Sequence, residues 1–583
     1  MGAVAGDQDQ VADPEQQYAQ LVAGEPSRIR EIAADIGAQD PAVITALDHV
    51  SDGIGATRWT GGLASAPAAL AGRMIYVDGT LVSWRLHRAS SVLDALAGDL
   101  VDLEDWALRG IQFWRRRDPA LDAAQVETLR ASVSLYLAVY AAYASVRLQS
   151  AATELTTFDA EIVEWLRNGA GKDYDVGVKY GGHRGPRIPD TVANGDGNGW
   201  TPQGLAHDGD GHFVTTSYRT DAGELGNPDD DVDDSQLSVI DDRTGEVVSQ
   251  VQLNGWGGAV PPQHSGGVAI NGDRVFVVGG GKLYEYSMAE IREAGPGGAV
   301  TPVRTPDDIG GATSYVTVAN GNLYLGNYGG SEVTSHPLDG DGRPDLDGGT
   351  TYTTPDGTNG IAVLPDGSHV YSVNAGRGAP GELVVDNHPS PGGLDADHTI
   401  EIGNLPEELV LVDGQLVVAN EAGADDYAPW DEDGRDGAGD DGVKDTGGSE
   451  NTAAEDFWAQ THLHSIPLEA LDGPGADGFY VDPISLEDGA RELWRCSDAL
   501  DVARTALLGL HLPASLLPEV SGADALSTAL DTRLDEDRGD LVDLAAAGDR
   551  IGNSLKDTAD DYTVTDLLTG RTIDAQARAL VDG

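Results

Sequence analysis

The spacing of apolar side chains divides the chain into three parts. From about residue 14 to residue 168, apolar positions recur every three or four residues, as at Ile29, Ile32 and Ile36. That period matches one face of an α-helix and predicts several long helices. A break at Asp118-Pro119 separates two of them. We therefore expect an N-terminal helical bundle over residues 14–168.

The middle part, residues 190–484, has short β-branched and aromatic runs between glycine-rich turns, and its apolar side chains alternate as in strands. A hairpin pattern recurs there at roughly 45 to 60 residues, a spacing typical of four-stranded propeller blades. In each copy an Asn-Gly or Asp-Gly pair joins two apolar runs, because these residues adopt the backbone angles of tight turns at little cost. The copies begin at Gly204, Gly267, Tyr315, Gly360 and Glu408.

This repeat predicts an all-β propeller of five or six blades. A sixth blade would be completed by strands near residues 176–192 or 479–484, since propellers often close by joining chain ends. Residues 235–248, SQLSVIDDRTGEVV, and 364–374, LPDGSHVYSVN, resemble the YVTN-type repeat family. The resemblance implies the fold, and it implies little about function because propellers host many activities.

Helical periodicity returns near Glu487, with Pro513 and Pro518 separating two helices. The third part, residues 487–570, is therefore predicted to be a helical hairpin. The complete prediction is a multidomain α+β chain: an N-terminal helical bundle, a central propeller and a C-terminal helical hairpin.

Charge narrows the range of partners. The formal net charge is −61, with 97 acidic residues. Nucleic acid and anionic membrane surfaces would be repelled, so neither is expected as a partner. The scarcity of lysine beside abundant arginine and aspartate indicates a salt-adapted host, although a GC-rich genome gives the same bias. The single cysteine, Cys496, excludes an intramolecular disulfide and a zinc site built on paired thiolates.

The N-terminal residues are acidic and lack the pattern of a signal peptide. The most apolar stretch, residues 131–146, is shorter than the roughly 18 to 20 residues needed to cross a bilayer, so it predicts a buried bundle helix and no membrane span. We expect a secreted or surface protein that uses a route independent of a signal peptide; the alternative is a cytoplasmic protein.

A tryptophan–glycine turn marks the first long helix pair. Trp59-Thr60-Gly61 stands where a helical hairpin should turn. Gly61 permits a tight turn and Trp59 can pack across the hairpin. The stretch from about residue 22 to 70 resembles the Trp-X-Gly family of actinobacterial type VII secretion proteins. The alternative is an ordinary helical turn with a buried tryptophan.

A second signal lies near the other end of the chain. Tyr562 and Asp566 are four residues apart, so a helix would place both on one face. The segment resembles the Tyr-x-x-x-Asp/Glu export signal of the same secretion system, which implies a secretion ATPase or a chaperone as a partner. That family usually carries the two motifs on separate partner chains, so their presence on one chain is a departure.

An aspartate-rich loop predicts a calcium site. Asp339, Asp341 and Asp345 fit the D-x-D-G-x-x-D pattern, in which carboxylates around glycines supply the oxygens that Ca²⁺ prefers. The alternative is a chance string in an acidic chain.

The histidines show no compact metal signature: His207 with His212, and His462 with His464, are expected in turns and on the surface, and His264 is a candidate for the channel mouth. No nucleophile elbow or phosphate loop is present in the sequence. We therefore expect a binding module for an unknown extracellular ligand rather than an enzyme. The alternative is a calcium-dependent, lactonase-like propeller hydrolase.

Overall fold

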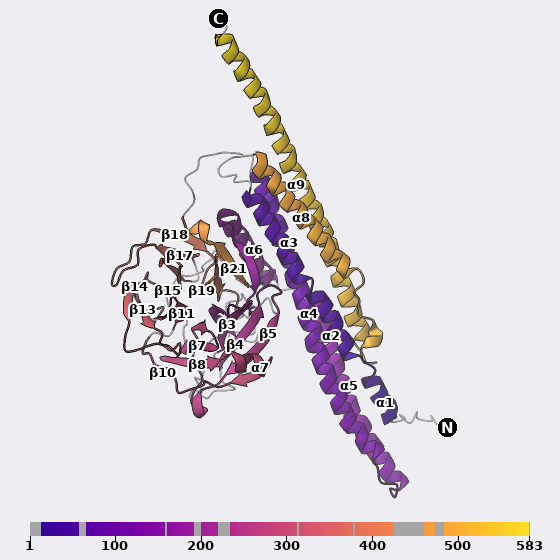
Figure 1. The fold of residues 1–583 in the computed structure, drawn as a ribbon. Helices are drawn as coiled ribbons and strands as arrows, with labels where there is room; N and C mark the ends of the chain where they lie inside the picture. The colour runs from indigo at the N-terminus through magenta and orange to yellow at the C-terminus, as the bar shows by residue number, and fades with distance from the viewer. Residues whose placement is uncertain are drawn as a thin grey trace, which may run out of the picture. The chain divides into compact units, whose positions relative to one another are not determined.

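The computed structural model describes residues 13–56, 66–157, 160–189, 191, 200–219, 234–311, 314–376, 379–424, 460–472 and 483–581. Long helices precede and follow a ring of sheets in the sequence, and all strand pairs of these sheets are antiparallel except β5 (Val247–Leu253) with β9 (Gly298–Val300) (Figure 1). The helices are α1 (Pro14–Leu21), α2 (Pro26–Gly37), α3 (Asp40–Ala56), α4 (Ala66–Arg115), α5 (Ala123–Thr156), α6 (Ala160–Tyr180), the short α7 (Met288–Ala294), α8 (Pro483–Leu507) and α9 (Ala523–Val581).

Five sheets form the blades of a propeller. The five innermost strands are β2 (Thr201–His207), β6 (Gly267–Asn271), β11 (Tyr315–Ala319), β15 (Thr358–Val363) and β19 (Pro406–Val412). They contain the five hairpin starts expected from the repeat, and the ring has five blades.

The remaining strands complete the blades, and β9 and β1 join blades that are not their neighbours in the chain. Blade 1 adds β3 (His212–Arg219), β4 (Asp234–Asp241), β5 (Val247–Leu253) and β9 (Gly298–Val300). Blade 2 adds β7 (Arg274–Gly279), β8 (Lys282–Ser287) and β10 (Asp307–Asp308), and blade 3 adds β12 (Asn322–Gly326), β13 (Glu332–Pro337) and β14 (Thr350–Thr353). Blade 4 adds β16 (His369–Val373), β17 (Gly381–Asp386) and β18 (His398–Ile402), and blade 5 adds β20 (Gln415–Asn420), β21 (His462–Pro467) and β1 (His183–Arg187).

Blade 5 closes the ring with strands from both sides of the repeat. The strand β1, which precedes blade 1 in the chain, pairs antiparallel with β21, with His183 opposite Ser465. An apolar cluster then joins blade 5 to blade 1, including Val417 and Leu463 on one side and Leu205 and Phe213 on the other. The strand expected near residues 176–192 therefore completes the fifth blade rather than a sixth.

A buried arginine anchors blade 5 to nearby helices. The Arg184 side chain on β1 is 1% exposed. Its guanidinium donates to Asp173 Oδ2 on α6 at 2.8 Å and to Thr80 Oγ1 on α4 at 2.7 Å, and it lies 4.6 Å from the ring centre of Tyr76. Because a buried charge needs hydrogen-bonded partners, this network fixes α4 and α6 against the edge of the propeller.

The chain divides into two compact units. The helical unit comprises residues 1–42, 82–158 and 501–543, and the propeller unit comprises residues 43–81, 159–500 and 544–583. Helices from both ends of the chain contribute to each unit. The three predicted domain ranges stay a prediction.

Helix α5 belongs to the helical unit and starts at a capping box formed by Asp122 and Gln125. Its apolar central segment is not fully buried: Leu135, Val139 and Val146 are 69%, 59% and 62% exposed. The predicted helix is confirmed, but its predicted burial is wrong there. Length and composition would allow α5 to cross a bilayer, which for a single helix is weak evidence of a span.

Candidate binding site on the propeller axis

A single carboxyl group occupies the centre of the ring. Glu408, on β19, is 1% exposed. Its two oxygens accept hydrogen bonds from the backbone N–H groups of Leu205, Val268 and Val316, each at 2.9 Å. These donors lie on the innermost strands of blades 1, 2 and 3, so one side chain connects three blades to blade 5.

Glycines make this convergence possible. Gly204, Gly267 and Gly360 occupy the position that Glu408 has in its own strand. A Cβ at Gly204 would lie 2.7 Å from Val268 N, and one at Gly267 would lie 2.6 Å from Val316 N. The innermost strands approach each other too closely for side chains at these positions. Glu408 is therefore the side chain that occupies the space on the ring axis, because three other blades have glycine at the equivalent position.

A group of polar side chains lies beside Glu408. The neighbouring Glu407 is 3% exposed and accepts a hydrogen bond from Asn359 Nδ2 at 2.8 Å. Gln203 Nε2 donates to Glu421 Oε2 at 2.7 Å, and Glu421 is partly exposed. With Asn374, whose side chain also hydrogen-bonds Glu407, these residues form what we call the axial polar cluster: Gln203, Asn359, Asn374, Glu407 and Glu421.

The two acidic groups of the cluster influence each other. Burial raises the pKa of Glu407 well above its usual range, the charge of Glu421 raises it further, and the amides of Asn359 and Asn374 lower it. Burial also raises the pKa of Glu408, although its three backbone donors act in the opposite direction. The amides of Gln203 and Asn359 donate and the carboxyl groups of Glu407 and Glu421 accept, so the cluster has both hydrogen-bond donors and acceptors.

Irregular strand pairing accompanies the cluster. The ladders of β2, β15 and β19 with their neighbours shift register around Gln203, Asn359 and Glu407. The ladders of β6 and β11 keep a regular register. Bulges of this kind redirect side chains and are frequent beside functional sites.

The predicted calcium residues form a tight turn. Asp339 Oδ1 accepts the backbone N–H groups of Asp341 and Arg343 at 2.8 and 3.0 Å. Within the described residues no group of three His, Cys, Asp or Glu side chains is arranged to hold a metal ion, so Asp339, Asp341 and Asp345 do not converge as ligands in this structure. Calcium binding stays a prediction.

The same turn occurs in blade 1. Asp208 Oδ1 accepts the N–H groups of Asp210 and His212 at 2.7 and 3.1 Å. The two segments share the sequence Asp-Gly-Asp-Gly, so the spacing of their acidic residues also serves turn formation.

The export residues are only partly described. Trp59 and Gly61 lie outside the described residues. Tyr562 and Asp566 lie within α9, so their backbone is helical and their spacing places them on one helical face. The helical part of this prediction is confirmed, and the export role stays a prediction.

The histidines have varied surroundings. His207 ends β2 and His212 begins β3, so they flank the predicted turn rather than lie within it, and they contact Asp242 and Asp208. His462 and His464 are 4% and 8% exposed, so their predicted surface position is wrong. They lie on β21, which pairs with β1 on one side and with β20 on the other, and burial is the main cause that lowers the pKa of His464.

His264 packs against the Tyr218 ring at a centroid distance of 3.9 Å. Its backbone has a φ of 48°, and Leu405, two residues before Glu407, has the same value. His264 lies in the segment that leads into β6, one of the innermost strands.

Sequence reasoning missed Glu407, Glu408 and Glu421. A signal for Glu408 was available in the repeat itself, because the five copies begin with glycine at three positions and with glutamate at one. No comparable signal marks Glu421, which follows β20 and meets Gln203 through the closure of the ring.

Comparisons with known proteins leave the family open. No protein-family model and no curated protein sequence matches the chain. Among solved structures, a Lactobacillus plantarum protein is 13% identical, with 32% of this chain and 57% of that chain covered and a TM-score of 0.19. BamB from Moraxella catarrhalis is 12% identical, with 42% of this chain and 96% of that chain covered and a TM-score of 0.18. The chain thus spans less than two thirds of the Lactobacillus protein, and similarities at this level carry no functional conclusion.

Proposed function

We propose that the chain is a propeller binding module that takes a polar ligand at the axial polar cluster. The observation that carries this proposal is the convergence of amide and carboxyl groups from blades 1, 4 and 5 at one end of the ring axis. Mostly apolar surroundings with a few convergent polar groups are typical of ligand sites. A sugar or another hydroxyl-rich surface component suits a cluster that both donates and accepts hydrogen bonds.

A glycan array probed with the purified chain tests this proposal. Glu421→Gln removes the partly exposed carboxylate and should weaken binding to any glycan recognised by the wild type at least tenfold, a loss typical of a charged hydrogen bond. Glu382→Gln, at an exposed position on β17, is the matched control and should bind as the wild type does. Wild-type failure on the array, or equal binding by Glu421→Gln, would contradict the proposal.

The module is further proposed to leave the cell by type VII secretion, with Trp59, Gly61, Tyr562 and Asp566 as the signal. Support comes from the helical backbone of residues 562–566 and from the sequence resemblance. Culture supernatants of wild type, Tyr562→Ala and a secretion-ATPase deletion strain should differ, with the chain present only in the first. Equal amounts in all three would end the export proposal.

A calcium-dependent hydrolase is the second candidate, and the electrostatic coupling of Glu407 with Glu421 favours it. A general acid beside a carboxylate is an arrangement that hydrolases use. Lactone or ester turnover that requires Ca²⁺ and is lost in Glu407→Gln would support this activity over simple binding.

A further inference from the structure

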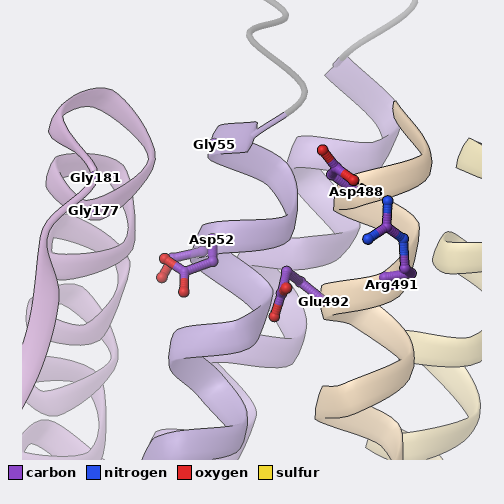
Figure 2. A pocket seen from close by; sticks show the side chains of 8 residues that line it. Asp52, Gly55, Gly177, Gly181, Asp488, Arg491 and Glu492 are labelled. Atoms are coloured by element: carbon purple, nitrogen blue, oxygen red, sulfur yellow. Dashed lines mark hydrogen bonds and ion pairs between the residues drawn. The ribbon is translucent and has the colours of Figure 1, made fainter. Parts of the chain in front are cut away.

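A cavity of about 500 Å³ lies where three helices of the propeller unit meet (Figure 2). Its walls come from α3, from the C-terminal end of α6 with the residue that follows it, and from α8. The lining residues are Ser51, Asp52, Gly55, Gly177, Gly181, Asp488, Arg491 and Glu492.

Two histidine–carboxylate pairs connect these elements. His49 Nδ1 on α3 lies 3.0 Å from Glu492 Oε2 on α8. His183 Nδ1 on β1 lies 3.5 Å from Asp52 Oδ1 on α3. The first pair therefore joins α8 to α3, and the second joins α3 to the edge of blade 5.

The four side chains are neither fully buried nor fully exposed. Their exposed fractions range from 22% for Glu492 to 40% for His183. Asp52 and Glu492 also face the cavity, so the group can exchange protons with solvent. At this level of exposure an ion pair keeps part of its Coulomb energy and has a smaller desolvation penalty than a fully buried pair.

The surroundings add negative charge. Burial raises the pKa of Asp52, the neighbouring Glu492 raises it further, and His183 and His49 lower it. Burial likewise raises the pKa of Asp48, one turn earlier on α3, to about 7. The other charged or titratable groups around the two pairs are Asp173 on α6, Arg184 on β1, His464 on β21, and Asp488, Arg491 and Arg495 on α8.

We propose that His49, Asp52, His183 and Glu492 form a pH-dependent clamp that holds α8 against α3 and blade 5. Imidazoles ordinarily gain a proton between pH 8 and pH 5. When both are charged, each faces a carboxylate and the clamp tightens. When both are neutral, Asp52 and Glu492 repel each other and the clamp loosens.

The clamp controls more than α8 itself. Gly552 on α9 packs against the Trp494 indole of α8, and Lys556 on α9 lies 3.5 Å from Glu487 Oε1. Loosening α8 therefore also loosens this part of α9. The clamp is independent of the proposed function, because it acts on helix docking whether or not the chain binds a glycan or is exported.

Hydrogen–deuterium exchange of the full chain between pH 8.5 and pH 5.5, corrected for the intrinsic rates, tests the clamp. Protection of α8 residues 483–500 should increase by roughly three- to tenfold toward the lower pH, as expected for two partly exposed ion pairs. Protection of β12 in blade 3 serves as the internal reference and should change less.

Matched variants separate the clamp from general acid stabilisation. The double variant His49→Gln/His183→Gln should lose most of the pH-dependent gain in α8, and Glu492→Gln should lose about half of it. His388→Gln, at an exposed position after β17, should retain the wild-type response. If the protection of α8 in the wild type does not change with pH, the clamp is overturned, and that measurement does not depend on the folding of any variant. An unchanged pH response of α8 protection in the double variant would also overturn it.

Discussion

The propeller axis and the helical unit each bury a carboxyl group, and the two groups find their donors in different places. Glu408 is held by three backbone N–H groups of the innermost strands. Asp537 on α9 is held instead by side chains: its Oδ1 lies 2.9 Å from Arg85 Nε and 3.1 Å from Arg533 Nη2.

The difference follows from secondary structure. The inner edge of a propeller blade has backbone donors that no further strand uses, and five such edges face one axis. A helix uses its backbone N–H groups internally, except in its first turn. A helical unit must therefore supply donors for a buried acid from side chains, whereas a ring of sheets supplies them from its backbone.

Removing the axial carboxyl group should have the largest effect. Glu408→Ala leaves three buried N–H groups without an acceptor and opens a void, so we expect a loss of about 3–5 kcal/mol in local unfolding free energy. Hydrogen exchange of the β2, β6 and β11 amides measures it. Glu408→Gln keeps one acceptor oxygen and should lose less. Equal exchange in all three proteins would show that the axis does not depend on this group.

Removing the acid from the helical unit should have a smaller effect. Asp537→Ala leaves Arg533 without its most buried partner, whereas Arg85 retains its ion pair with Asp540. We therefore expect a loss of about 2–4 kcal/mol in local unfolding free energy. Adding Arg533→Met should recover at least half of it, because an apolar pair can replace a buried ion pair. Exchange of α9 amides in the single and double variants checks this recovery. Glu408 offers no such rescue, since its donors are backbone groups.

The helical unit, through Asp537, and helix α3 of the propeller unit, through Asp48, should both become more stable in mild acid. Burial raises the pKa of Asp537 to about 6 and that of Asp48 to about 7. A group whose folded pKa lies above its unfolded value binds more protons when folded, so stability falls as pH rises from about 4 to 7. The urea midpoint should therefore be higher at pH 5 than at pH 7.5, by the equivalent of roughly 1–3 kcal/mol. Asp48→Asn should reduce this difference, and a higher midpoint at pH 7.5 would contradict it.

The acidic turns should respond least. Backbone donors hold the pKa of Asp339 below its usual range, so its stabilising effect is lost only in stronger acid. Asp339→Ala should lower the stability of the turn only slightly, because it removes an acceptor for two exposed N–H groups. Thermal unfolding of wild type and Asp341→Ala with calcium or a chelator also tests the metal prediction: a calcium-induced rise in Tm confined to wild type would support a site, and no rise would remove it.

The architecture was largely predictable because period and turn chemistry are local. The apolar period of three to four residues predicts α5 correctly, and the repeat places all five innermost strands. The axial polar cluster was not predictable in the same way. Gln203 and Glu421 are far apart in sequence and meet only because blade 5 closes on blade 1. The burial of His464 has a related origin, since its ring lies beside Gly182 and Arg184, which come from the other side of the repeat.

The closure strand also determines how the propeller responds to mechanical force. Pairing of β1 with β21 is antiparallel, and His183 at the start of β1 lies opposite Ser465 near the end of β21. The chain therefore enters and leaves the ring at the same end of one ladder. Tension applied through the flanking helices would separate that ladder one hydrogen-bonded pair at a time, in an unzipping rather than a shearing geometry, and blade 5 would open before any other blade carried load.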